Sequence, residues 1–318
     1  MKYELLIHNG SKIYSPSVLS DVKLTSERTC SPSKLEFDVY NDDLLKVEEG
    51  NLVTFKVDDY EAFYGFIFTK KYDNDKITIT AYDQLRYLKN KDTKSYENKR
   101  VDELITQIAS EYNLRTGTLF NSGYKIASRV EDNVTLMDMI QNAMDLTMQA
   151  TGDLYVVYDQ SGKINLSYIG NMFVPILLDE TTGSSIEYTS SIDKQTYNKV
   201  KLVYDNEESG TREVYVAQHG ENMNKWGTLQ FFEKLQNNTN GKALADTILK
   251  LYNKKTRSLT ISNAFGDNRV RGGSLVAVKL DLGDIKLQNL MLVEKCTQTY
   301  GKDEHTMNLT LSGGDFVV

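Results

Sequence analysis

The feature that most constrains this chain is a resemblance between two segments far apart in the sequence. Segment 50–58 reads GNLVTFKVD and segment 273–281 reads GSLVAVKLD, so both match Gly-x-Leu-Val-x-Φ-Lys-Φ-Asp, in which Φ is apolar. Each is followed by a loop, a long apolar strand and a turn into an alternating strand; these lie at 63–72 and 77–80 in the first copy and at 289–300 and 307–311 in the second. The shared order predicts that one β unit occurs twice in the chain.

A simpler explanation stays open at this stage. Any two three-strand meanders look alike, because alternation and turn chemistry limit the choice of residues. The shared Gly-x-Leu-Val pattern favours duplication over this alternative.

The first part of the chain predicts antiparallel strands. Segments 3–8 and 12–14 flank Asn9-Gly10, a dipeptide typical of a two-residue hairpin turn. Only 3 prolines occur beside 20 tyrosines, which favours long regular strands. Further strands are predicted at 21–25, 34–39, 51–57, 62–72 and 76–82, and this spacing is typical of a small barrel or sandwich.

The periodicity becomes helical in the middle of the chain. Apolar residues recur at helical spacing over 101–112, and a second helix begins at Thr135, where Asp138 completes a pattern similar to a capping box. Four methionines of this helix, at 137, 139, 144 and 148, are predicted to be packing residues. A hairpin follows at 154–159 and 163–169.

From about residue 184 the strand pattern returns. Strands are predicted at 185–189, 197–204, 213–217, 258–262, 274–280, 288–299 and 306–311. One helix, near 240–253, interrupts this series, and we expect it to cover an open end or face of the sheet.

The predicted fold class is therefore mainly β with an α+β insert. Two similar tube-like antiparallel β-barrels enclose a small two-helix/hairpin module. Residues 1–95 form the first barrel, 96–178 the α+β module, and 179–318 the second barrel with its inserted helix. The charged stretch 89–100 marks the first boundary.

Charge and hydropathy exclude several functions. The chain carries 37 Lys and Arg against 44 Asp and Glu, a net charge of −7, whereas a nucleic-acid partner requires a basic face. Glu4 lies where a signal peptide needs its apolar segment. The longest apolar run, 173–178, is far shorter than the ~18 residues of a membrane-spanning helix. We expect no nucleic-acid recognition, no signal peptide and no membrane insertion.

The rare residues offer little reactive chemistry. Cys30 and Cys296 are far apart, as are His8, His219 and His305, and none of them shows metal-ligand spacing. We predict two buried free thiols and three histidines on surface loops. No nucleophile elbow or phosphate loop occurs. The sequence therefore predicts no catalytic residue, no metal site and no cofactor.

Carboxylate chemistry is harder to exclude, because 44 acids offer many pairs. A glycosidase needs two carboxyls at a set distance, which a sequence does not show. The adjacent acids lie in hydrophilic runs typical of solvated loops; they are Asp42-Asp43, Glu48-Glu49 and Glu207-Glu208.

One aromatic cluster stands out. Trp226, Phe231 and Phe232 lie close together in sequence and suit either a sugar-stacking platform or a protein interface. We favour the interface, because the subunit faces of small barrels readily accept aromatic side chains.

The order of these elements resembles a known family. The segments that carry the resemblance are the strand pair GNLV and FYGFI at 50–53 and 63–67, the helix that begins VDELI at 101, the helix NVTLMDMI at 133–140, and the hairpin that begins GDLYV at 152. This succession is similar to the baseplate hub proteins of contractile phage tails and tail-like bacteriocins, in particular the XkdQ/YqbQ group, which is late control protein D-like. The resemblance spans nearly the whole chain.

The resemblance implies a non-enzymatic structural role. Hub proteins of this kind carry two tube-like barrels and form homotrimers, so that six quasi-equivalent barrels adapt a hexameric tail tube to a trimeric central spike. Baseplate wedge components and the tape-measure protein are further candidate partners. The implied location is the bacterial cytoplasm during assembly and then the phage or bacteriocin particle. A head-to-tail ring of this kind closes only when the repeated interface has the right rotation.

Two functions of other classes compete with this interpretation. One is a cell-wall (peptidoglycan) hydrolase, which an essential Asp or Glu would reveal. The other is a tail-tip carbohydrate-binding module, for which Trp226 would be the natural contact.

Overall fold

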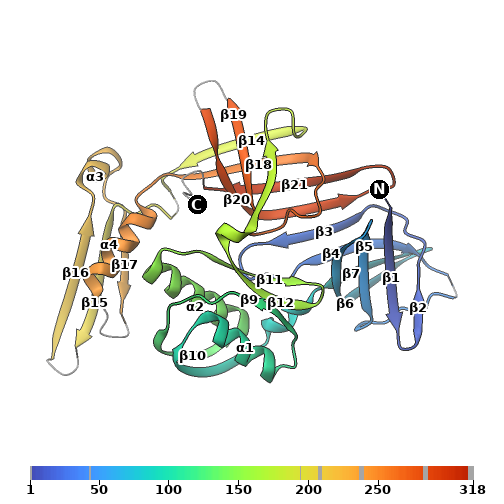
Figure 1. The fold of residues 1–318 in the computed structure, drawn as a ribbon, viewed down its shortest axis with the longest axis horizontal. Helices are drawn as coiled ribbons and strands as arrows, with labels where there is room; N and C mark the ends of the chain where they lie inside the picture. The colour runs from blue at the N-terminus through green and yellow to red at the C-terminus, as the bar shows by residue number, and fades with distance from the viewer. Residues whose placement is uncertain are drawn as a thin grey trace.

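The computed structural model describes residues 2–42, 44–193, 195–206, 210–235, 240–281 and 286–313 (Figure 1). Its largest element is one 13-stranded sheet in the order β14-β18-β21-β20-β3-β4-β7-β6-β5-β1-β2, with β19 also paired to β20 and β13 to β19. The sheet contains two similar sets of strands, which we call the first and the second repeat.

The first repeat contains the N-terminal strands. They are β1 (Tyr3–Asn9), β2 (Lys12–Tyr14), β3 (Val22–Glu27), β4 (Lys34–Tyr40), β5 (Leu52–Val57), β6 (Tyr60–Asp73) and β7 (Lys76–Tyr82). The predicted Asn9-Gly10 hairpin is confirmed, with Asn9 opposite Lys12.

The second repeat contains six strands. They are β13 (Phe173–Leu178), β14 (Ser185–Ser191), β18 (Thr256–Phe265), β19 (Leu275–Asp281), β20 (Lys286–Tyr300) and β21 (His305–Ser312). Their neighbour order, β14-β18-β21-β20-β19-β13, repeats the order β3-β4-β7-β6-β5-β1 of the first repeat. Segments 50–58 and 273–281 thus hold the same topological position.

The two repeats also share their register. Leu52 lies opposite Phe66 as Leu275 lies opposite Leu292. The two long strands carry a bulge at the same place, between Ile67 and Thr69 in β6 and between Val293 and Lys295 in β20. One difference is that β1 runs antiparallel to β5, whereas β13 runs parallel to β19.

Each repeat has its own apolar core. The first is built from strand residues such as Phe37, Phe55 and Ile79, and the second from residues such as Ile261, Met291 and Leu309. The repeats are joined, because β20 pairs with β3. The fold is therefore mainly β with two similar antiparallel units, as predicted, and the two units share one continuous sheet.

The α+β module lies between the repeats in sequence. It contains β8 (Lys91–Lys99), α1 (Val101–Glu111), β9 (Thr116–Leu119), β10 (Ile126–Thr135), α2 (Leu136–Thr151), β11 (Tyr155–Gln160) and β12 (Lys163–Tyr168), with short 3-10 turns η1 (Gln84–Lys89) and η2 (Ile169–Met172) at its ends. Strands β8 and β10 form a ribbon, and β9 joins the β11–β12 hairpin.

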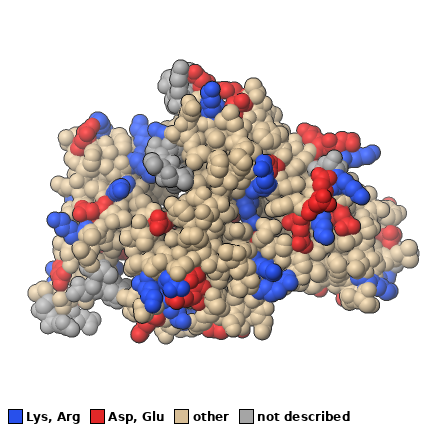
Figure 2. Space-filling model, viewed as in Figure 1, with Lys and Arg blue, Asp and Glu red and all other residues tan. Residues whose placement is uncertain are grey.

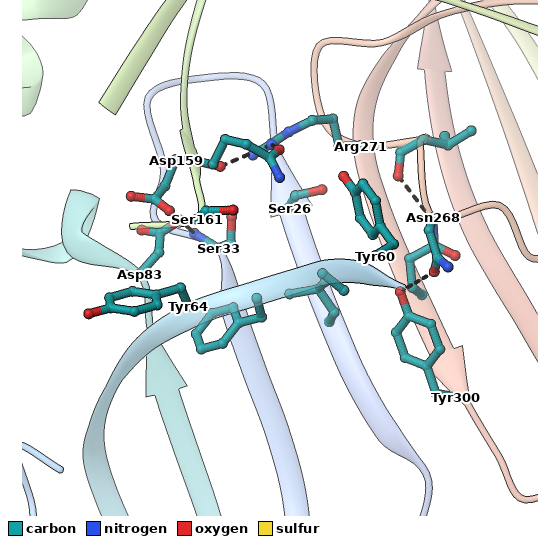
Figure 3. A pocket seen from close by; sticks show the side chains of 16 residues that line it. Ser26, Ser33, Tyr60, Tyr64, Asp83, Asp159, Ser161, Asn268, Arg271 and Tyr300 are labelled. Atoms are coloured by element: carbon teal, nitrogen blue, oxygen red, sulfur yellow. Dashed lines mark hydrogen bonds between the residues drawn. The ribbon is translucent and has the colours of Figure 1, made fainter. Parts of the chain in front are cut away.

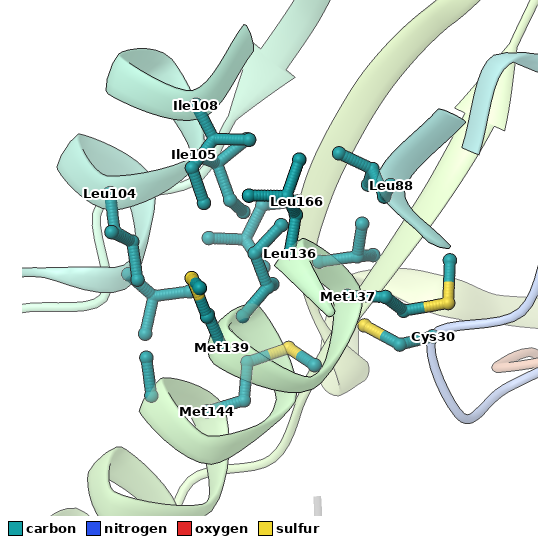
Figure 4. Packing of buried hydrophobic residues seen from close by; sticks show 14 of the residues in the cluster. Cys30, Leu88, Leu104, Ile105, Ile108, Leu136, Met137, Met139, Met144 and Leu166 are labelled. Carbon is teal, nitrogen blue, oxygen red and sulfur yellow. The ribbon is translucent and has the colours of Figure 1, made fainter. Parts of the chain in front are cut away.

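The helices of the module form where the sequence predicts them. Thr135 caps α2 by accepting the N–H of Asp138 at 3.0 Å, and Gly152 ends the helix in the left-handed region. Three of the four methionines, Met137, Met139 and Met144, are buried in the module core beside Leu136 (Figure 4). Their prediction as packing residues is confirmed.

The module strands β8 and β10 were not predicted. Their sequences, KDTKSYENK and IASRVEDNVT, lack the alternation of apolar and polar residues that predicts a half-buried strand, although every second residue of β8 from Asp92 to Tyr96 is at least partly buried. The range 1–95 ends inside β8, and the range 96–178 includes β13, which pairs with β19. The three-domain division itself stays a prediction.

A separate insertion lies between β14 and β18. It contains β15 (Lys199–Asn206), β16 (Thr211–Gln218), α3 (Gly220–Trp226), β17 (Gln230–Lys234) and α4 (Gly241–Tyr252), and it lies to one side of the large sheet (Figure 1). The structure differs here from the predicted second barrel. Strands β16-β15-β17 form their own sheet, and α4 packs on that sheet through Ala245 and Ile248. Alternation predicts a strand but does not say which sheet it joins.

Candidate functional site

A small polar cavity of about 40 Å³ lies where the two repeats and the module meet. Figure 3 shows Asp83 and Ser33 from the first repeat side, Asp159 from the module and Arg271 from the second repeat around it. Two buried carboxyls, Asp83 and Asp159, and the guanidinium of Arg271 line this cavity, which is the candidate site.

Asp83 is placed by the end of a strand. It follows β7 directly and caps η1, where its Oδ1 accepts the N–H of Leu85 at 3.0 Å. Its Oδ2 accepts the N–H of Ser33 at 2.8 Å, so the carboxyl also ties down the β3–β4 loop. Both oxygens therefore accept backbone N–H groups, one from η1 and one from the first repeat.

Asp159 is placed by the β11–β12 hairpin. Its Oδ1 accepts the N–H of Gly162 at 2.8 Å in the hairpin turn, and its Oδ2 accepts the side-chain amide of Gln84 at 3.0 Å. Gln84 in turn donates to the carbonyl of Arg115 and accepts its N–H. The turn η1, which follows the first repeat directly, is thus bonded through one amide to the hairpin and to the segment before β9.

The two carboxyls have strongly raised pKa values. Burial, and after it the charge of the nearby Asp159, raise the pKa of Asp83 to about 7. Burial also raises the pKa of Asp159, to about 6, against hydrogen bonds from Gly162 and Gln84 and the charges of Arg271 and Arg115. The pair therefore holds a proton near neutral pH.

Arg271 brings in the second repeat. Its Nη1 donates to the carbonyl of Asp159 at 3.0 Å and to Oε1 of Gln160 at 3.2 Å, and its guanidinium lies 4.3 Å from the ring centre of Tyr158. The buried Nε of Arg271 has no partner among the described residues. The guanidinium thus holds the second repeat to the hairpin of the module.

The arrangement of Asp83, Asp159 and Arg271 suits a structural role, in which these side chains hold parts of the fold together. A raised carboxyl pKa is a property of a general acid, but both Asp83 and Asp159 already accept hydrogen bonds on both oxygens. A cavity of about 40 Å³ has room for a water molecule or so, and a sugar does not fit. Sequence reasoning missed these residues, because 83, 159 and 271 share no motif and only the fold brings them together.

The histidines are placed differently from the prediction. His8 lies on β1, and its Nε2 is buried without a hydrogen-bond partner among the described residues. His305 begins β21, stacks on Tyr300 at a ring-centre distance of 4.4 Å and bonds Gln298. His219 caps α3 by accepting the N–H of Asn222. The surface-loop prediction is therefore wrong for His8 and His305, because each lies on a strand and is partly enclosed by its neighbours.

The cysteine prediction is confirmed. Cys30 and Cys296 are free and buried, and burial raises the pKa of each thiol to about 12. Cys30 lies in the β3–β4 loop and packs beside Met137 in the module core (Figure 4). Both thiols are therefore protonated and inert near neutral pH.

The predicted loop acids and aromatic cluster do not form a site in the described residues. Asp42, Glu48 and Glu49 are exposed, whereas Asp43, Glu207 and Glu208 lie outside the described residues. Consecutive residues of β17 point to opposite faces, so Phe231 stacks on Tyr252 under α4 while Phe232 is exposed. Trp226, Phe231 and Phe232 thus do not make one platform.

In the described part of the chain, no three His, Cys, Asp or Glu residues gather in a way that could hold a metal ion. None of the helices described is long and apolar enough to cross a membrane. Lysine, arginine and acidic side chains are interspersed on the face shown in Figure 2.

Comparison with known proteins decides the family. The YQBQ-like family model matches residues 22–312. The chain belongs to the YQBQ-like family. It is 30% identical to YqbQ of Bacillus subtilis strain 168 over 83% of this chain and 81% of YqbQ. It is 27% identical to the phage-like element PBSX protein XkdQ of the same strain, over 92% of this chain and 91% of XkdQ. The predicted resemblance is confirmed.

Solved structures show that the fold is shared with tail proteins. The 43 kDa tail protein of prophage MuSo2 from Shewanella oneidensis superposes with a TM-score of 0.70 at 11% identity, covering 97% of this chain and 98% of that protein. A type VI secretion component of E. coli, described as similar to the T4 tail proteins gp27 and gp5, superposes with a TM-score of 0.59 at 10% identity, covering 97% of this chain and 76% of that protein. The YQBQ-like chain thus has the fold of phage tail proteins.

Proposed function

We propose that this protein is the central hub of a contractile-tail baseplate. It acts as a homotrimeric symmetry adaptor that joins the hexameric tail tube to the trimeric central spike. The observation that carries this proposal is the duplication, in which two repeats share strand order, register and bulge position inside one sheet. Three copies of a chain with two equivalent repeats present six equivalent surfaces, whereas the module and insertion occur once per chain and keep threefold symmetry.

The comparisons support this role. The PBSX relative is a component of a phage-like element, and the E. coli neighbour is described as similar to gp27 and gp5. We assign the chain to the tail or tail-like particle, after assembly in the bacterial cytoplasm. Spike and tube are its direct partners, and baseplate wedge components and the tape-measure protein are further candidates.

The test is co-expression of the full chain with the spike and tube genes encoded beside it. We expect particles in which native mass spectrometry finds three copies of this chain per spike trimer and electron microscopy shows a ring at the spike end of the tube. A parallel expression without the spike gene controls for self-association. If spike and tube assemble and this chain stays outside them, the proposal is wrong.

Peptidoglycan hydrolysis is the competing function that the structure makes testable. Asp83 and Asp159 are the buried carboxyls with the pKa of an acid catalyst, but their cavity is too small for a sugar. We propose a non-enzymatic role for the chain. Clearing of a peptidoglycan suspension by the wild-type protein, lost in Asp159→Asn, would contradict it.

A further inference from the structure

The joint between the two repeats is a specific strand pair. Residues Lys295–Tyr300 of β20 pair antiparallel with β3, and β19 pairs with the other half of β20, up to Leu292. The hydroxyls of Thr25 and Thr297 lie 3.1 Å apart across this joint, and Lys295 bonds Glu27 at 2.9 Å. The joint thus has close side-chain contacts in a defined register.

Because the two repeats are equivalent, each of the two strands of this joint has a counterpart in the other repeat. It maps β20 onto β6, because both long strands have the same bulge, and it maps β3 onto β14, because each is the neighbour of an equivalent strand, β4 or β18. When residues are counted from the shared bulge, Thr297 of β20 corresponds to Lys71 of β6. Thr25 of β3 corresponds to Thr189 of β14.

Among the described strands, neither corresponding place has a second neighbour. Strand β5 pairs with β6 only up to Phe66, so the segment Thr69–Asp73 pairs with β7 alone among these strands. Strand β14 lies at the end of the large sheet and, among the same strands, pairs only with β18. Six strands separate β14 from β6 along the sheet, so the two open places do not meet within one copy.

Side chains at the two unpaired strand edges are more exposed than their equivalents in the internal joint. Tyr72 has 58% of its surface exposed, whereas its equivalent in the internal joint, Gln298, has 3%. Thr189 is exposed, while its equivalent Thr25 is half-buried. Open strand edges with exposed rings are surfaces that another chain readily extends.

We propose that β14 of one copy pairs antiparallel with the second half of β6 of a neighbouring copy, with Thr189 opposite Lys71, and repeats between copies the joint that β3 and β20 make within one. This inference rests on the proposed function and names its subunit interface. The seam places Tyr188 opposite Tyr72, an aromatic pair of the kind that stabilises sheets. At its end Glu187 lies opposite Asp73 and diagonal to Lys71.

The seam joins copies head to tail. Such an interface either closes a ring or grows without end, depending on the rotation between copies. Because the internal joint and the seam are equivalent, each copy adds two repeats with similar geometry. A ring of six repeats then contains three copies.

The test is disulfide trapping in assembled particles. Lys71→Cys with Thr189→Cys places two thiols directly opposite each other across the seam, at a spacing that suits a disulfide. Thr25→Cys with Thr297→Cys is the matched internal control, which links within one chain. Lys71→Cys with Ser185→Cys is the out-of-register control, because Ser185 lies four residues before Thr189 in β14. The native thiols are buried and do not compete.

We expect mild oxidation of purified particles to give linked dimers and trimers, about tenfold more for the Lys71/Thr189 pair than for the Lys71/Ser185 pair. Particles that contain the chain but give no more linkage for Lys71/Thr189 than for Lys71/Ser185 would overturn the seam and leave the hub proposal standing. Particles that assemble without the chain would overturn the hub proposal instead. Linked species larger than a trimer would contradict the closed ring.

Discussion

At the scale of single residues, the polar centre of the molecule lies where its parts meet. Asp83 ties a backbone loop and a turn to the first repeat, Asp159 receives the amide of Gln84, and Arg271 reaches in from the second repeat. A buried charge that lacks full compensation lowers stability, and these carboxyls avoid that cost by holding a proton. Their protonation should therefore affect how firmly the three parts are held together.

We expect the stability of the protein to fall as the pH rises from 5 to 8. The pKa of Asp83 is about 7 in the fold against 3.8 as a free side chain, so the folded state binds more protons than the unfolded state across this range. Deprotonation should lower the free energy of unfolding by about 2 kcal/mol, measured by urea unfolding at both pH values. Asp159→Asn removes the neighbouring charge and should flatten the dependence. The lowered pKa of His305 acts in the opposite direction in both proteins and cancels in the comparison. An unchanged slope in the variant would contradict the role of the pair.

At the scale of elements, the helices follow local rules and the strands follow their neighbours. Helix α2 begins where Thr135 satisfies a free N–H and ends where Gly152 adopts the left-handed conformation. Strands β8 and β17 carry little local signal, and they form because β10 and β15 lie beside them. The contribution of a helix cap to stability should therefore be measurable by a single substitution at the capping residue.

Loss of the α2 cap should destabilise the module. Thr135→Ala removes the acceptor for the N–H of Asp138 and should lower the free energy of unfolding by about 1 kcal/mol in chemical denaturation. Thr106→Ala is the matched control, because Thr106 is exposed in the interior of α1, where alanine is the better helix former. Equal losses in the two variants would show that the cap contributes nothing of its own.

At the scale of the whole molecule, the two repeats, the α+β module and the insertion between β14 and β18 contribute differently to the fold. The repeats make one sheet, the module packs its core against the β3–β4 loop through Cys30, and the insertion has a sheet and core of its own. The insertion enters between Ser191 and Thr256, which lie directly opposite each other in the β14–β18 pair. The first repeat bridges the equivalent point with a short loop between β3 and β4.

We therefore expect the insertion to be removable. Replacement of residues 192–255 by Asn-Gly, a two-residue hairpin turn, should leave a folded monomer with the near-ultraviolet circular dichroism of the large sheet and one cooperative unfolding transition. Some loss of stability is expected, because α4 also contacts α2. A version that replaces 84–172 in the same way should fail, since it removes the partners of Cys30 and Arg271. A misfolded 192–255 replacement would show that the insertion is needed for the fold.

Elements with strong local patterns can be predicted from the order of the amino acids alone. The Asn9-Gly10 hairpin, the apolar faces of α1 and α2, and the shared pattern of 50–58 and 273–281 follow from turn chemistry, helical spacing and alternation, which act over a few residues. The buried thiols follow from the usual environment of cysteine. Even the register equivalence of β6 and β20 begins with this local pattern.

Which strands share a sheet, and which charges share a cavity, becomes known only from the packing of the folded chain. Strands β15 and β16 alternate like those of the repeats yet form a separate sheet, because alternation records one buried face and not what covers it. Asp83, Asp159 and Arg271 meet because the two repeats and the module pack against one another. Nothing in the spacing of these residues along the chain indicates that they are close in space. The open edges of β6 and β14 likewise emerge only when the pairing of every neighbouring strand is known.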